Sequence, residues 1–181
     1  MTRPVNETPA QSGWDGLLDP GEEILWQGRP DDAIRLRVGD YIMIGFGIVF
    51  GGFALVWMAL ASLAGGFLWM FGLLHFSVGA GVMLWPLLGR PYIRRHTWYT
   101  LTGKRAFIAT DVPVRGKTLK SYPISADSPL TLKDGDPGSV LFAYEKHRTK
   151  NGYRETHVGF EYITDAREVY GLLRDIQRGA A

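Results

Sequence analysis

Forty-nine consecutive residues, Tyr41 to Gly89, contain no Lys, Arg, Asp or Glu, although charged residues make up 21% of the chain. An apolar run longer than about 18 residues is typical of a membrane-spanning helix, and about 20 residues cross a bilayer once. This run is about twice that length, and Ala64 to Gly66 near its middle favour a turn. We therefore expect a membrane α-helical hairpin that crosses the bilayer twice, with helices over about 41–64 and 67–88.

The charges outside this run are distributed unevenly. Residues 1–40 carry four basic and eight acidic side chains, whereas residues 90–181 carry sixteen basic and ten acidic ones. Arginines flank both ends of the run, and the turn inside it has no charge. Because basic flanks stay on the cytoplasmic side of a membrane, we expect a multi-pass protein of the cell inner membrane with both termini in the cytoplasm.

The chain divides into four segments on this basis. Residues 1–19 are expected to be a flexible tail, and 20–40 a cytoplasmic segment that contains a short strand and leads into the membrane. The transmembrane hairpin occupies 41–89. Residues 90–181 follow it and are numerous enough for one small cytoplasmic domain with its own core.

The last segment has the pattern of an α+β domain. Its β-branched and aromatic runs are separated by turn residues, which predicts antiparallel strands. Asp165 with Glu168 favours a helix start, and the apolar stripe from Val169 to Ile176 predicts an amphipathic C-terminal helix. We expect a small barrel or curled sheet with this helix packed on it. The six predicted strands are 97–102, 105–110, 119–124, 130–133, 139–145 and 156–163.

Two motifs flank the hairpin. Pro20 to Pro30 has the sequence Pro-Gly-Glu-Glu-Ile-Leu-Trp-Gln-Gly-Arg-Pro, and Arg94 to Arg105 has Arg-Arg-His-Thr-Trp-Tyr-Thr-Leu-Thr-Gly-Lys-Arg. With the hairpin between them they resemble the bacterial PH-domain membrane proteins, over nearly all of the chain after residue 19. The first motif also resembles one found in photosynthetic-complex assembly proteins of purple bacteria.

The resemblance implies a PH-like antiparallel β-barrel capped by a C-terminal helix. It implies no single activity, because the fold serves varied binding functions. Such a barrel usually has seven strands, one more than the six predicted after the membrane. Ile24 to Gln27 is therefore a candidate for an added edge strand, since both ends of the hairpin are expected on the same side.

Small residues recur at a four-residue spacing in both expected helices, as Gly47 with Gly51 and as Ser77 with Gly81. Such patterns let helix backbones approach closely inside a membrane. We expect these faces to close the hairpin on itself, and a seam between two copies of the chain is the alternative.

His75 is the most specific polar residue of the run, because ionisable groups near the middle of a membrane helix are rare and usually face protein. Counting from the turn places Val56 or Trp57 opposite it. One interpretation is a neutral ring bonded to a carbonyl or to the Trp57 indole. The other is contact with a polar group of a partner membrane protein, a lipid or a cofactor. His75 and Trp57 are thus candidate intramembrane contacts.

A basic cluster follows the hairpin. Snorkelling towards anionic lipid and control of topology explain it, at about 1 kcal/mol per charge near the surface. Alternatively, Lys104 and Arg105 on the first strand turn hold a lipid headgroup. Nucleic acid is not expected as a partner, because basic and acidic residues are interleaved and a tethered domain has restricted access. The candidate headgroup contacts are Arg90, Arg94, Arg95, Lys104 and Arg105.

No pattern in the chain indicates an enzyme. There is no cysteine, and the four histidines lack metalloprotease spacing. Gly116-Lys117-Thr118 lacks the preceding glycine of a phosphate-binding loop, since Asp111 occupies that position. The Asp134 to Glu145 segment has Ser139 where a calcium loop has its glycine. We expect no catalytic residue, no cofactor and no metal.

The sequence therefore predicts a non-enzymatic, inner-membrane-anchored PH-like binding or scaffold module, such as an accessory or assembly factor of a membrane protein complex. Its expected partners are membrane lipids and another membrane protein or complex. The alternative is a PH-like module that senses anionic lipid.

Overall fold

The structure is a computed structural model that describes residues 14, 16–113, 116–150 and 152–179. The described residues form two compact units. One consists of residues 30–97 with 110–117, and the other contains the chain up to Arg29, residues 98–109 and the chain from Thr118 onward.

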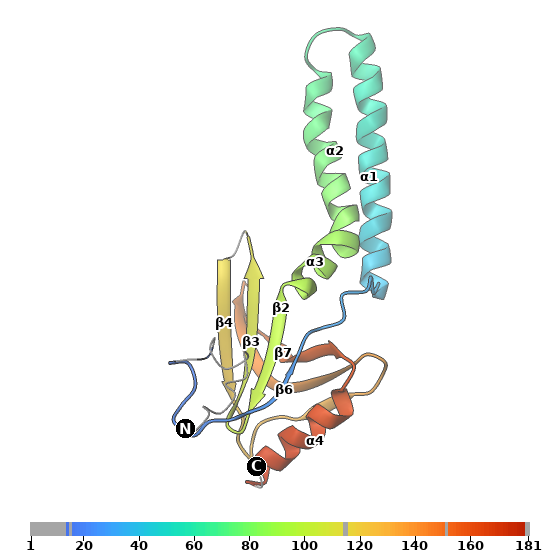
Figure 1. Ribbon diagram of the computed structural model, residues 1–181. Coiled ribbons are helices and arrows are strands. Elements are labelled where there is room, and N and C mark those ends of the chain that lie inside the picture. Colours follow the sequence, from blue (N-terminus) through green and yellow to red (C-terminus); the bar gives the residue numbers. More distant parts are fainter. Residues whose placement is uncertain (1–13, 15, 114–115, 151, 180–181) are drawn as a thin grey trace, which may run out of the picture. The chain divides into compact units, whose positions relative to one another are not determined.

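The first unit is a hairpin of apolar helices. It contains α1 (Val38–Leu63), α2 (Trp69–Leu84), the π-helical turn η1 (Trp85–Gly89) and α3 (Arg90–Arg95), as Figure 1 shows. Two helices, Val38–Leu63 and the continuous stretch Trp69–Arg95, are long and apolar enough to cross a membrane by length and composition. The expectation of two long apolar helices is confirmed.

The second helix does not end where the sequence placed its end, near residue 88. Pro86 lacks an amide hydrogen and cannot donate within a regular α-helix. It lies in η1, where wider π-helical hydrogen bonding lets the helix pass the proline and continue as α3. The helix therefore carries Arg90, Arg94 and Arg95 on its final turns.

The second unit is built on two antiparallel sheets and a helix. One sheet has the order β1-β2-β3-β4 and the other has the order β5-β6-β7. The described strands are not closed into the single barrel that was expected, because β4 pairs only with β3 and β5 pairs only with β6. The elements are β1 (Ile24–Gly28), β2 (Thr97–Thr102), β3 (Arg105–Val112), β4 (Gly116–Pro123), β5 (Thr131–Lys133), β6 (Gly138–Thr149), β7 (Gly152–Ile163) and α4 (Ala166–Gln177).

The strand that precedes the helical hairpin joins this sheet. β1 pairs antiparallel with β2, with Gly28 opposite Tyr99 and Gln27 opposite Thr100. This confirms the predicted edge strand, and the part of the chain that the structure describes then has seven strands. Segments on either side of the hairpin in the sequence therefore form one sheet.

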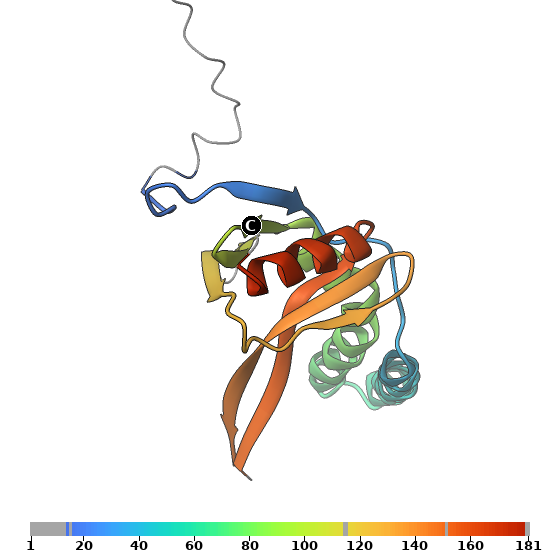
Figure 2. The ribbon, with the colours of Figure 1, turned by 90° about the horizontal axis from the view of Figure 1, so that it is seen from below.

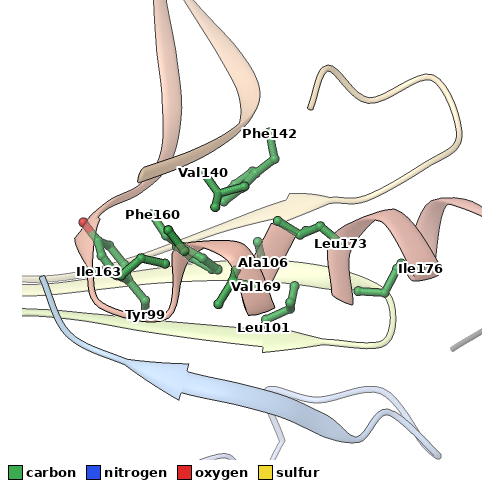
Figure 3. Close-up of a cluster of buried hydrophobic side chains, with 11 residues drawn as sticks. Tyr99, Leu101, Ala106, Val140, Phe142, Phe160, Ile163, Val169, Leu173 and Ile176 are labelled. Atoms are coloured by element: carbon green, nitrogen blue, oxygen red, sulfur yellow. The ribbon is translucent and has the colours of Figure 1, made fainter. Parts of the chain in front are cut away.

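Large apolar side chains from both sheets and from α4 form the core (Figure 3). The stripe predicted for α4 is buried at Val169, Leu173 and Ile176, and the helix packs against β5 and β6. Burial of each such side chain contributes about 1.5–3 kcal/mol. The core residues are Tyr99, Leu101, Ala106, Val140, Phe142, Phe160, Ile163, Ala166, Val169, Leu173 and Ile176.

Candidate functional site

The two motifs that flank the hairpin contact each other. Glu22, in the turn before β1, is buried and accepts hydrogen bonds from Thr102 Oγ1 at 2.6 Å and from Arg105 Nη2 at 2.5 Å. Its carboxylate also accepts the backbone N–H of Asp19 at 2.9 Å. The pairing of β1 with β2 produces this arrangement, because it places Ile24 opposite Thr102.

The electrostatics of Glu22 follow from these partners. The hydrogen bond from Arg105 lowers the pKa of Glu22 to about 2, against the opposing effect of burial, and Thr102 and the Asp19 amide act in the same direction as Arg105. Glu22 in turn raises the pKa of Arg105. A charge held this firmly inside the fold positions the chain and is not free for a mobile ligand.

The other residues of the first motif also have structural contacts. The Trp26 indole lies over Gly28, where an added Cβ would be 2.3 Å from the ring, so only glycine fits beneath it. The same indole packs against Phe160 with ring centroids 5.3 Å apart, and its Nε1 donates to Asp165 at 3.4 Å. Arg29 lies 4.9 Å from the ring centre of Trp98 in the second motif, a cation–π contact.

Most of the candidate headgroup contacts are bound by the segment that precedes the helical hairpin. Arg90 pairs with Asp40 at 2.6 Å, and Arg95 pairs with Asp32 at 2.5 Å. Arg94 donates to the carbonyl oxygen of Asp31 at 3.2 Å, and Arg105 binds Glu22. Lys104 differs from these four, because it is exposed on the turn between β2 and β3 and has no ion pair with any described residue.

Sequence reasoning missed these pairings. The excess of acidic residues before the hairpin and of basic residues after it was visible as a signal. The excess was interpreted through membrane topology alone, although opposite charges on two segments that return to the same place also pair with each other.

The helix-packing glycines are only partly those expected. Gly47 and Gly51 face α2, where an added Cβ on Gly47 would lie 2.6 Å from the carbonyl oxygen of Gly79. Ser77 is exposed and donates to the Leu73 carbonyl of its own helix at 2.8 Å, and nothing lies within 4 Å of a Cβ on Gly81.

The face of α2 that meets α1 instead carries Gly72 and Gly79. An added Cβ on Gly72 would lie 2.1 Å from Met58 Cγ. Sequence reasoning missed these two glycines, although their seven-residue spacing, about two helical turns, was a signal that could have identified this face. Ser77 and Gly81 therefore do not close the hairpin as expected, because they lie on another side of the helix.

His75 makes a contact within its own helix. Its Nδ1 lies 3.1 Å from the Phe71 carbonyl oxygen, so this nitrogen is the donor. The ring lies beside Phe71 and, on α1, beside Phe50, with centroids 4.8 and 5.9 Å away. No hydrogen bond or ring contact joins His75 to Trp57 within the described residues. With Nδ1 donating, Nε2 of a neutral ring is an acceptor, and it has no donor in that part of the chain.

The remaining polar candidates do not come together as a metal site. Within the residues that the structure describes, no three His, Cys, Asp or Glu side chains could hold one ion. Asp134, where a calcium loop was considered, pairs with Arg167 at 2.5 Å, and this pairing lowers the pKa of Asp134. His147 lies opposite Arg154 and His157 opposite Tyr144, so the two histidines are not paired with each other.

The geometry thus identifies two features: a histidine ring acceptor on α2 and a sheet domain that includes the strand before the helical hairpin. Comparison of the chain with known protein families, with curated proteins and with solved structures finds no match in any of the three.

Proposed function

We propose that this chain is a PH-like binding module, anchored in the inner membrane by its helical hairpin, that acts as a scaffold or assembly factor for a membrane protein complex. Both termini lie in the cytoplasm in this proposal. The module binds partners and catalyses no reaction.

The anchoring part of the proposal is supported by the two apolar helices and by their flanks. Each helix is long enough to span a hydrocarbon layer of about 30 Å, and the turn between them carries no charge. The arginines all lie at the other end of the hairpin, which favours a cytoplasmic location for both of its ends.

The PH-like part is supported by the arrangement of the sheets. The seven described strands in two antiparallel sheets and the C-terminal helix packed on the core agree with the strand number and the capping helix that the resemblance implies. The two motifs that carry the resemblance also have a structural role in this arrangement, because Glu22 of one binds Thr102 and Arg105 of the other.

The observation that carries the choice of function is the binding of the basic residues after the hairpin by the segment before it. Arg90, Arg95 and Arg105 are each within 2.6 Å of a carboxylate of the chain itself. A headgroup would have to displace these carboxylates. This favours protein binding over the sensing of anionic lipid.

His75 supports a partner inside the membrane. Its Nε2 acceptor, once Nδ1 is bonded to the Phe71 carbonyl, matches a donor on another membrane helix. An unsatisfied polar atom in lipid is costly, so a donor there would be stabilising.

The test is purification of the tagged full chain from its own membranes in mild detergent, followed by mass spectrometry. We expect the same membrane protein to be retained in every preparation and to be lost or reduced with His75→Leu. The matched control is Phe76→Leu, which changes a neighbouring lipid-exposed residue. Retention of no membrane protein by the wild-type chain would contradict the proposal.

A second measurement separates protein binding from lipid sensing. The full chain, embedded in nanodiscs of neutral lipid, is mixed with vesicles of neutral lipid and with vesicles containing one-third anionic lipid. We expect no preference for the anionic vesicles. A salt-sensitive preference that disappears with Lys104→Glu would favour the lipid sensor instead.

A further inference from the structure

The β6–β7 hairpin is longer than its core contacts require. Each strand has twelve residues, but its buried side chains lie only near Gly138 at the start of β6 and Ile163 at the end of β7. The described residues of 144–157, named here the distal hairpin, are exposed except for half-buried Glu145. Figure 2 shows the distal hairpin extending away from α4. Two strands that are exposed on both faces are only marginally stable alone, so packing within the domain does not account for the length of this hairpin.

The register of the strands defines two faces of the distal hairpin. One face carries Tyr144 opposite His157, Lys146 opposite Glu155, and Arg148 opposite Tyr153. The other face carries Glu145 opposite Thr156, and His147 opposite Arg154. Tyr144 and Tyr153 are 47% and 76% exposed. Tyrosine and arginine are the residue types that recur at the energetic centres of protein interfaces.

The acidic residues of the distal hairpin are already bound. Glu145 accepts from Lys120 Nζ at 2.8 Å and from the Tyr122 hydroxyl at 2.5 Å, and these two bonds lower the pKa of Glu145. Glu155 pairs with Lys146 at 3.2 Å. Arg148, Lys150 and Arg154 have no ion pair with any described carboxylate. The surface thus offers positive charge that has no ion-pair partner among the described residues.

The backbone of β7 is open along the same stretch. β7 is the last strand in the order β5-β6-β7, and from Gly152 to His157 only β6 pairs with it in the described chain. Its outward N–H and C=O groups are a template for an added strand. Neither a proline nor a bulge protects this stretch, since the register shifts in the pairing of β6 with β7 lie nearer the core.

We propose that the distal hairpin docks an extended acidic segment of a partner protein, which adds to the open edge of β7 as a further strand. Side chains of an added strand alternate between faces. An acidic side chain beside Arg154 would therefore be followed by an apolar one beside Tyr153 on the opposite face. The segment is one of alternating acidic and apolar residues. This inference rests on the proposed binding function and assigns it a surface.

The probe is a fluorescein-labelled peptide of ten residues with alternating Glu and Val, and its control has Gln in place of each Glu. The full chain is held in nanodiscs of neutral lipid, and binding is measured by fluorescence anisotropy. We expect the Glu peptide to bind at least about tenfold tighter than the Gln peptide at low salt. We also expect this advantage to shrink as salt screens the charges. Equal affinities, or no binding by either peptide, would overturn the proposal.

Variants locate the site. Arg154→Glu should reduce binding of the Glu peptide at least about tenfold, because Arg154 lies on the face that carries the Glu side chains. The matched control, Arg178→Glu, makes the same charge change on an exposed residue outside the distal hairpin. Arg154→Gln, together with hydrogen exchange of the β6–β7 amides, shows that the hairpin remains folded. Equal weakening by the control variant would overturn the assignment of the site.

Strand addition is tested by backbone methylation. Two versions of the Glu peptide are N-methylated, one at every Glu and one at every Val, which removes the donors of one edge or the other. Strand addition requires one version to lose binding and the other to keep it. Equal effects of the two, whether loss or retention, would overturn it.

Two further outcomes are separable. Capture of vesicles with one-third anionic lipid through Arg148 and Arg154, without peptide binding, would make this a membrane-binding surface and overturn the proposal. If peptides do not bind but a membrane protein still co-purifies with the variant, this surface assignment fails while the proposed function stands.

Discussion

The helical hairpin and the sheet domain are stabilised by opposite kinds of side chain. The closest contacts between α1 and α2 involve glycine, at Gly47, Gly51, Gly72 and Gly79. The sheet domain is filled by large apolar side chains such as Phe142 and Phe160, which are almost fully buried. In water, burial of apolar surface drives association. Helices in lipid gain little from such burial and associate through close van der Waals packing. The same chain therefore packs its sheet domain with large side chains and its helical hairpin with residues that have no side chain.

The largest expected effect is a loss of stability of the sheet domain. Phe160→Ala removes a ring that contacts Trp26, Tyr99 and Phe142. It should lower the free energy of unfolding of the domain by about 3–5 kcal/mol. Urea denaturation of the full chain in detergent measures this. Tyr153→Ala on the same strand is the control, and at an exposed position it should cost less than about 0.5 kcal/mol.

The next effect concerns the charged contact inside the domain. The pKa of Glu22 lies near 2, below its ordinary value of 4.5, so Glu22 stabilises the fold above pH 4.5 and this contribution is lost as the pH falls towards 2. Glu22→Gln should cost about 3 kcal/mol at pH 7. The difference between wild type and variant should nearly vanish at pH 2. A difference that stays constant from pH 7 to pH 2 would show that the charge of Glu22 is not responsible.

A smaller effect is expected where volume is added to the helical hairpin. A Cβ on Gly79 would lie 2.7 Å from the backbone nitrogen of Gly51, so Gly79→Leu should push the helices apart. Gly81→Leu is the matched control, because the space around Gly81 is open. Because the chain has no cysteine of its own, a pair can be introduced at position 50 on α1 and position 75 on α2. The yield of their crosslinking then measures the separation of the two helices. We expect the yield to fall severalfold with Gly79→Leu and to be unchanged with Gly81→Leu.

The smallest effect is expected for an ion pair at the surface of the sheet domain. Lys120→Met removes one of the two donors to Glu145 and leaves the hydrogen bond from Tyr122. As a largely exposed pair, it should contribute less than about 1 kcal/mol. Urea denaturation at low and high salt should show a small loss that disappears at high salt. A loss as large as that of Glu22→Gln would contradict the distinction between buried and exposed charge.

Sequence reasoning recovered what depends on local pattern. The uncharged run identified both apolar helices, the β-branched and aromatic runs between turn residues identified most strands, and the apolar stripe at helical spacing identified α4. It also identified β1 as an edge strand, because the strand count required one more. These features have a period or a composition that a single sequence displays.

The rest depends on how distant segments meet. Nothing near Glu22 indicates that Arg105 is its partner, because the two are 83 positions apart. Gly79 and Gly81 are both glycines two positions apart, and only the orientation of α2 about its axis decides which of them faces α1. The predicted strands 139–145 and 156–163 are shorter than β6 and β7, because they leave out most of the distal hairpin. Its residues are exposed on both faces and therefore lack the apolar alternation that predicts a strand.

Asp40 and Arg90 are the two charged residues that bound the uncharged run in the sequence, and they pair with each other in the structure. During synthesis, Asp40 emerges fifty residues before Arg90, so the ion pair cannot form until Arg90 has been added. Until then the carboxylate has only the backbone N–H and the nearby charge of Arg37, so we expect the start of α1 to be less stable before the second helix is in place. The ion pair would then form late in biogenesis, only after both helices of the hairpin have been synthesised and have packed together.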